Sequence, residues 1–273
     1  MYIPELSTFQ PFSLERLLST CFSLPDRNLS SCVLIDLDNP RDVSKLGFTQ
    51  SQGNEVQKRA LTYFYEPLNG DIGSKLNISG CDLFAFETTG GSNLDPSNIV
   101  YNVDGDSLTF SEDICPNYDL VFALTDYSLT APLTAMAKKH GFRGATLHGL
   151  NDIILNSGLS VDYRSVSKQA ELFRSFLDCA DQFRISFECL AKTYELVIEC
   201  GKQTAQKSHG LCPAGSPDIA NLPAGEVYFV PQGASGSFPF RFSDGTISEM
   251  VVDKGSIIEA KLISGSEELV QNR

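Results

Sequence analysis

The chain has 273 residues, with 34 acidic and 21 basic side chains and a formal charge of −13. This length predicts one large domain or two small ones, and 42% hydrophobic residues suffice for a sizeable core. The acidity disfavours nucleic acid and anionic membrane surfaces as partners, because both attract clustered Lys and Arg. No apolar run reaches the roughly 18 residues that a spanning helix needs, so no membrane partner is expected.

Cysteine usage predicts a reducing compartment. The eight cysteines are widely scattered and none forms a C-x-x-C pair, which disfavours a zinc finger or a redox motif. The N-terminus lacks the basic start and apolar run of a signal peptide. We therefore expect reduced, mostly buried thiols and a cytoplasmic protein.

The first half of the chain predicts alternating helices and strands. Ser13 can cap a short helix with leucines on one face, and Cys32–Asp36 has the length and composition of a buried strand. A helical period follows from Val56 to Phe64, and Asp82–Phe86 is a second buried strand.

The middle of the chain predicts a parallel crossover. Asp119–Leu124 is expected as a buried strand, a helix follows between Pro132 and Gly141, and Arg143–Leu147 is the next strand. A longer helix is predicted from about Ser165 to Asp181. Its expected apolar stripe consists of Val166, Ala170, Phe173, Phe176, Leu177 and Ala180.

Beyond residue 182 the pattern changes to short strands with hairpin signals, among them Ser243-Asp244-Gly245 and Asp253-Lys254-Gly255. The predicted fold class is α/β. Residues 1–181 form a doubly wound, mainly parallel sheet domain. Residues 182–273 are expected to form a mostly antiparallel, β-rich domain of the catalytic type that is incomplete in this chain.

Few residues offer catalytic chemistry. His140 is expected at a helix C-terminus, where a cation complements the dipole, and His209 in a solvated loop. His148 follows a strand at the carboxyl end of a parallel sheet, where ligands bind in doubly wound folds. Asp126 and Asp152 are helix caps or site residues in similar loops. Ser128 lies outside any G-x-S-x-G elbow, so a hydrolase triad has no anchor.

Glu226 is the candidate metal ligand. It begins the apolar run Glu226–Val230, where a lone carboxylate either faces water at a strand edge or meets a partner. Hard metal ions favour such oxygen donors.

The segment around Glu226 carries a family resemblance. Asn221-Leu222-Pro223-Ala224-Gly225-Glu226-Val227, followed by Pro231, Gly233 and Gly236, resembles the signature of the thermophilic metallo-aminopeptidases of the aminopeptidase T and S type. Weaker anchors agree in order over about residues 115–265: Asp119–Thr130, Gly141-Phe142-Arg143, Gly149-Leu150, Gly158–Tyr163 and Gly210-Leu211-Cys212.

The resemblance implies a function. The glutamate of the motif, here Glu226, would be the first ligand of a two-metal centre of zinc, cobalt or manganese that activates water to release N-terminal residues from a peptide. The resemblance also implies a homodimer. The family's other ligands include histidines downstream of the motif, whereas no histidine of this chain follows His209.

This departure leaves three hypotheses. The chain is part of a longer metallo-aminopeptidase and is inactive alone, with its second domain incomplete. Alternatively, it belongs to an iron-dependent ring-cleaving dioxygenase of the same fold, which acts on a small molecule. Finally, it is a non-catalytic binding or assembly relative that needs no metal.

Overall fold

The computed structural model describes residues 9–271, which separate into two compact units. Unit 1 comprises the described residues up to Gln169 together with Ser208–Glu226. Unit 2 comprises Ala170–Lys207 and the described residues from Val227 onward. No helix of this part of the chain is long and apolar enough to cross a bilayer.

Unit 1 is built on a seven-stranded sheet with the order β10-β6-β5-β1-β2-β3-β4. All neighbours from β10 to β2 run parallel, whereas β3 and β4 add an antiparallel edge. This arrangement confirms the predicted α/β class and the mainly parallel sheet. The strands are β1 (Leu29–Leu37), β2 (Ile78–Glu87), β3 (Ile99–Asn102), β4 (Ser107–Thr109), β5 (Leu120–Ala123), β6 (Arg143–Thr146) and β10 (Ile219–Asn221).

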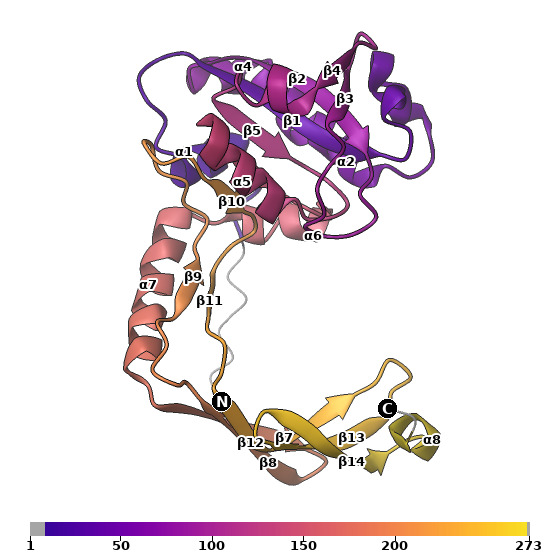
Figure 1. The fold of residues 1–273 in the computed structure, drawn as a ribbon, viewed down its shortest axis with the longest axis vertical. Helices are drawn as coiled ribbons and strands as arrows, with labels where there is room; N and C mark the ends of the chain where they lie inside the picture. The colour runs from indigo at the N-terminus through magenta and orange to yellow at the C-terminus, as the bar shows by residue number, and fades with distance from the viewer. Residues whose placement is uncertain (1–8, 272–273) are drawn as a thin grey trace. The chain divides into compact units, whose positions relative to one another are not determined.

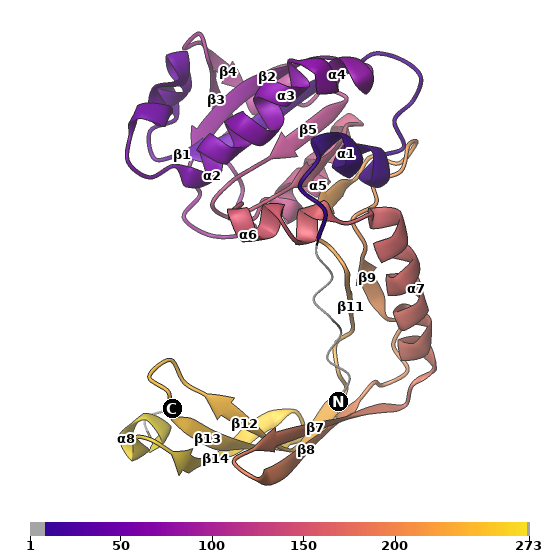
Figure 2. The same ribbon diagram turned by 180° about the vertical axis from the view of Figure 1, so that it is seen from behind.

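Helices cover both faces of this sheet (Figures 1 and 2). Alternation along β1 sends Val33 and Ile35 into one apolar cluster and Cys32 and Leu34 into the other. The first cluster packs under α1 (Leu14–Cys21), α2 (Glu55–Ala60), η2 (Leu61–Tyr65), α3 (Glu66–Leu68), α6 (Asp152–Leu155) and η4 (Gly158–Ser160). The second packs under α5 (Thr130–His140) and η3 (Phe110–Ile114). The 3-10 segment η1 (Pro40–Gln50) and α4 (Asp71–Lys75) complete the unit.

Several local predictions are confirmed. The Ser13 hydroxyl accepts a hydrogen bond from the Arg16 N–H and caps α1, as expected of an N-cap serine. Gly141 ends α5 in the left-handed conformation with φ 91°. All eight cysteines are free thiols, and six are buried, as predicted from their scatter.

Unit 2 contains a five-stranded antiparallel sheet with the order β14-β13-β12-β8-β7. The predicted turn Asp253-Lys254-Gly255 is a two-residue hairpin, with Lys254 at φ 50° and Gly255 at φ 81°, as a type I′ turn requires. The strands are β7 (Gln182–Cys189), β8 (Lys192–Glu199), β12 (Gly233–Arg241), β13 (Ile247–Asp253) and β14 (Ser256–Ser264), followed by the short helix α8 (Glu267–Gln271).

The division of the chain differs from the expected boundary between residues 181 and 182. Helix α7 (Tyr163–Cys179) passes from unit 1 to unit 2 at residues 169–170, and Ser208–Glu226 returns to unit 1. The reason is strand pairing, because β10 lies parallel to β6. The predicted strand at Glu226 is β11 (Glu226–Tyr228), which pairs with β9 (Gln206–Ser208) in a separate two-stranded sheet.

The predicted apolar stripe of α7 is only partly buried. Ala170 is 5% exposed, whereas Phe173 is 61% and Phe176 is 63% exposed. Periodicity identifies the side chains that share a helix face, but it does not identify an element that covers that face.

Candidate functional site

The carboxyl ends of β1, β5, β6 and β10 form one edge of the parallel sheet, here called the carboxyl edge. The chain continues from β1 to β2 on one side and later places β5 on the other side of β1. The topological switch point therefore lies between β1 and β5, which is where ligands bind in doubly wound sheets. Asp36 near the end of β1 and Asp126 after β5 lie at this point.

Gln57 of α2 links these two carboxylates. Its Nε2 donates to Asp36 Oδ1 at 2.8 Å and to Asp126 Oδ2 at 3.1 Å. The backbone N–H of Asp126 also donates to Asp36 Oδ1, at 3.0 Å. Asp36 and Gln57 are each 1% exposed, whereas Asp126 is exposed. The buried Gln57 Oε1 has no hydrogen-bond partner among the described residues. Once the hydrogen bonds within the cluster are made, the groups that remain are oxygen acceptors. These would suit an amine or hydroxyl donor.

Burial raises the pKa of the Asp36 carboxyl, and the hydrogen bonds from Asp126 and Gln57 offset part of that effect. A raised pKa in the folded state means that stability falls as the pH rises from the ordinary aspartate value of 3.8 through the folded value.

We expect the variant Asp36→Asn to lose this part of the pH dependence, because an amide does not ionise. Urea unfolding at pH 4 and pH 7.5 measures the effect. At each pH, the free energy of unfolding of the variant is subtracted from that of the wild type. This difference should fall toward the higher pH. Asp95→Asn, at an exposed carboxylate in the loop after β2, is the matched control and should show no such trend. A constant difference for Asp36→Asn would contradict the prediction.

A chain of hydroxyl groups joins the remaining loops of the carboxyl edge. Ser128 Oγ lies 3.0 Å from Thr130 Oγ1, which lies 2.8 Å from Thr146 Oγ1. Thr146 in turn donates to Asn221 Oδ1 at 3.3 Å, and its carbonyl accepts from the Leu222 N–H at 2.9 Å. These contacts fasten the Asn-Leu-Pro motif to the parallel sheet. Ser128 serves this network through its hydroxyl contacts with Thr130.

The backbone before Glu226 is held from two sides. Tyr163, which is fully buried, accepts the Ala224 N–H through its hydroxyl at 3.2 Å, and Gly225 donates to the Ser208 carbonyl at 2.9 Å. Gly225 has φ 132°, a region that favours glycine. Glu226 follows as an exposed residue whose carboxylate makes no hydrogen bond or ion pair with any described residue. Its carboxylate is thus available to a ligand.

The three histidines lie on different segments of unit 1. His140 is in the last turn of α5, as predicted, and His148 is exposed beyond β6. Ser167 Oγ lies 3.3 Å from His209 Nδ1, which also accepts the Leu211 N–H. Asp152, expected as a cap or a site residue, begins α6 after its cap Asn151 and pairs with Arg59 at 3.0 Å.

These positions bear on a possible metal centre. In residues 9–271, no three His, Cys, Asp or Glu side chains group closely enough to hold a metal ion. Glu226 fits the part of a single oxygen ligand, whereas a catalytic zinc site takes about three protein ligands. The described residues therefore do not form the full two-metal centre.

The sequence did not single out Asp36 or Gln57. Asp36 carried a weak signal, because it is a charged residue near the carboxyl end of a buried strand. Gln57 carried none, since its burial depends on how α2 packs on β1.

Comparison with known proteins adds no relative. No protein-family model matches the chain, and a search of the curated proteins finds no significant match. The aminopeptidase resemblance therefore stays a prediction that rests on the Asn221–Val227 motif.

Proposed function

We propose that this chain is part of a metal-dependent hydrolase of the aminopeptidase type and that Glu226 supplies one metal ligand. The observation that carries the proposal is the free, exposed carboxylate of Glu226 at the end of an anchored motif. An anchored backbone reduces the conformational entropy that a ligand side chain loses on binding. The other ligands would come from outside the described residues. A homodimer and a peptide substrate remain predictions of the same proposal.

The test measures metal affinity. We expect the complete protein, which would supply the other ligands, to bind Zn²⁺, Co²⁺ or Mn²⁺ in calorimetric titrations. Glu226→Gln in that protein should weaken the binding by at least about 10-fold, because even groups that only support a metal ligand change the affinity by that factor. Glu188→Gln is the matched control, because Glu188 is an exposed strand carboxylate of β7 with no described partner. It should leave the affinity unchanged.

Two results would contradict the proposal. One is an equal affinity of wild type and Glu226→Gln, and the other is an equal loss in Glu188→Gln. The identity of the metal and the activity of the natural gene product separate the reaction classes. Peptide hydrolysis with zinc, cobalt or manganese supports the proposal, whereas ring cleavage with iron supports the dioxygenase alternative.

The second candidate function is a non-catalytic binding module. The buried Asp36–Gln57 pair at the switch point favours it, because such a pair can recognise a donor ligand without a metal. It predicts no effect of Glu226→Gln on function.

A further inference from the structure

The opposite edge of the sheet in unit 1, where the parallel strands begin, contains a pocket of about 360 Å³. Its volume lies within the range of small-molecule sites. Two arginines and one aspartate line it, together with backbone of the loop that precedes β10. We call it the arginine pocket. Its lining consists of Pro25, Arg27, Leu29, Asp119, Gly141, Arg143 and Ala214–Pro217.

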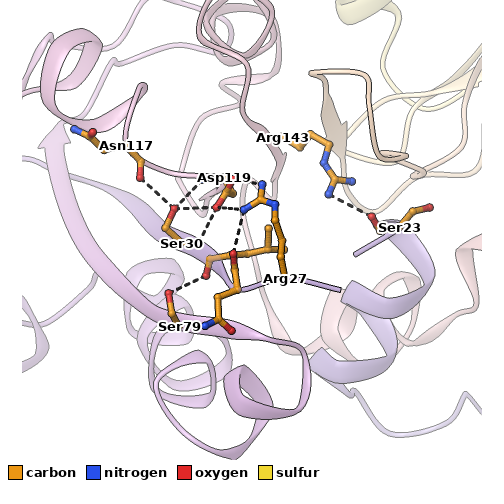
Figure 3. Close-up of polar contacts among 9 residues, drawn as sticks. Ser23, Arg27, Ser30, Ser79, Asn117, Asp119 and Arg143 are labelled. Carbon is orange, nitrogen blue, oxygen red and sulfur yellow. Dashed lines mark hydrogen bonds and ion pairs between the residues drawn. The ribbon is translucent and has the colours of Figure 1, made fainter. Parts of the chain in front are cut away.

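Arg143 is a buried cation that has no carboxylate within ion-pair distance among the described residues, although Asp119 lies close enough to act on it electrostatically. It is 9% exposed and forms no ion pair with a described carboxylate. Its Nη1 donates to the Cys212 carbonyl at 2.8 Å, and its Nη2 donates to the Ser23 carbonyl at 3.3 Å (Figure 3). A guanidinium has five N–H donors, so these two bonds leave donors free for a further acceptor. Burial lowers the pKa of Arg143, although the group stays charged at neutral pH.

Arg27 contributes the second guanidinium and is more accessible. Its side chain is 58% exposed and contacts both oxygens of Asp119, at 2.6 and 3.2 Å (Figure 3). Asp119 is further held by the N–H and the hydroxyl of Ser30, at 2.9 and 3.2 Å. The carboxylate of Asp119 is therefore well satisfied, and Arg27 lowers its pKa. Arg27 Nη1 also donates to the Asn28 carbonyl at 3.0 Å. Of its five N–H donors, the Nε–H and one Nη2–H are then left for a further acceptor.

The charges of the pocket favour an anion. Two arginines and one aspartate leave a net positive charge in a chain whose formal charge is −13. A buried charge is costly unless it is paired, and Arg143 forms no direct ion pair with Asp119 or with any other described carboxylate. Guanidinium groups bind carboxylate and phosphate with two parallel hydrogen bonds.

We propose that the arginine pocket binds a small oxyanion, a phosphate or carboxylate group of a metabolite, through Arg143 and Arg27. The proposal is independent of Glu226 and of any metal, since all its residues lie on the pocket at the start of the strands.

The test is an NMR titration of the full 273-residue protein with inorganic phosphate and, separately, with acetate, at constant ionic strength. We expect saturable shifts of the amide signals of Gly215 and Ser216, which line the pocket. Tighter binding of phosphate assigns a phosphate ligand, and tighter binding of acetate assigns a carboxylate ligand.

Variants then assign the binding to the arginines. We expect Arg27→Gln to raise the dissociation constant of the anion about 10-fold or more, because the variant loses a hydrogen bond to a charged group. Arg143→Lys keeps the charge but loses the planar fork, so it should also weaken binding, provided that circular dichroism shows it folded. Arg184→Gln is the matched control, because Arg184 is 59% exposed and pairs with Glu195 in unit 2.

The decisive comparison is between the anion affinities of Arg27→Gln and Arg184→Gln. This comparison can be made even if Arg143→Lys does not fold. The proposal is overturned if neither anion binds the wild type saturably, if the shifts leave out Gly215 and Ser216, or if the two glutamine variants bind equally.

Discussion

Phe122→Ala is expected to lower the free energy of unfolding by about 3–5 kcal/mol, the usual cost of removing a large buried side chain. Phe122 is 0% exposed in the middle of β5. Its ring lies 5.9 Å from that of Phe22, edge to face, and 6.2 Å from that of Phe64. Such aromatic pairs contribute beyond the burial of area, so the cavity would remove packing from α1, β5 and η2 together.

Equilibrium urea unfolding followed by circular dichroism measures this loss. Phe173→Ala is the control, because Phe173 is 61% exposed on α7 although the sequence pattern assigned it to a buried stripe. Its effect should stay within about 0.5 kcal/mol. A cost for Phe173→Ala equal to that for Phe122→Ala would show that the apolar face of α7 is covered in solution.

Gly144→Ala is expected to destabilise unit 1 by more than about 4 kcal/mol, or to prevent its folding, because the added methyl group has no space. A Cβ atom at Gly144 would lie 1.9 Å from the carbonyl oxygen of Val121 and 3.2 Å from the Ile219 side chain. Gly144 pairs with Val121 on one side and with Ile219 on the other. Strand β6 would have to move away from β5, which breaks the ladder that aligns the carboxyl edge.

Thermal unfolding and the yield of folded protein measure this effect. Gly70→Ala is the matched control, since its nearest atom to an added Cβ lies at 3.5 Å. Gly70 is the N-cap of α4, where alanine is less favourable than glycine, so this change should cost about 1 kcal/mol at most. A Gly144→Ala protein as stable as the Gly70→Ala protein would refute the close approach of β5 and β6.

Some residues of the candidate site could be predicted from the sequence and others could not. The loops after the buried strands were recognisable, and Asp126 was found in one of them. Gln57 was not, because its contacts with Asp36 and Asp126 span 21 and 69 residues of sequence. Likewise, Arg143 was part of a weak motif anchor, but its burial without a described counter-ion depends on Phe22, Ser23 and Cys212, which come from distant segments.

The sequence by itself determined the α/β class, the parallel crossover between Asp119 and Leu147, the hairpin turns of unit 2 and the position of Glu226 at the start of a strand. These features are local, because residue period, caps and turn chemistry act over a few neighbouring residues. Only the tertiary structure decided that Ser208–Glu226 returns to unit 1 beside β6, that Phe173 is exposed and that Arg27 and Arg143 share a pocket. Those outcomes depend on pairing and packing between residues far apart in the chain, whose free energies no local pattern contains.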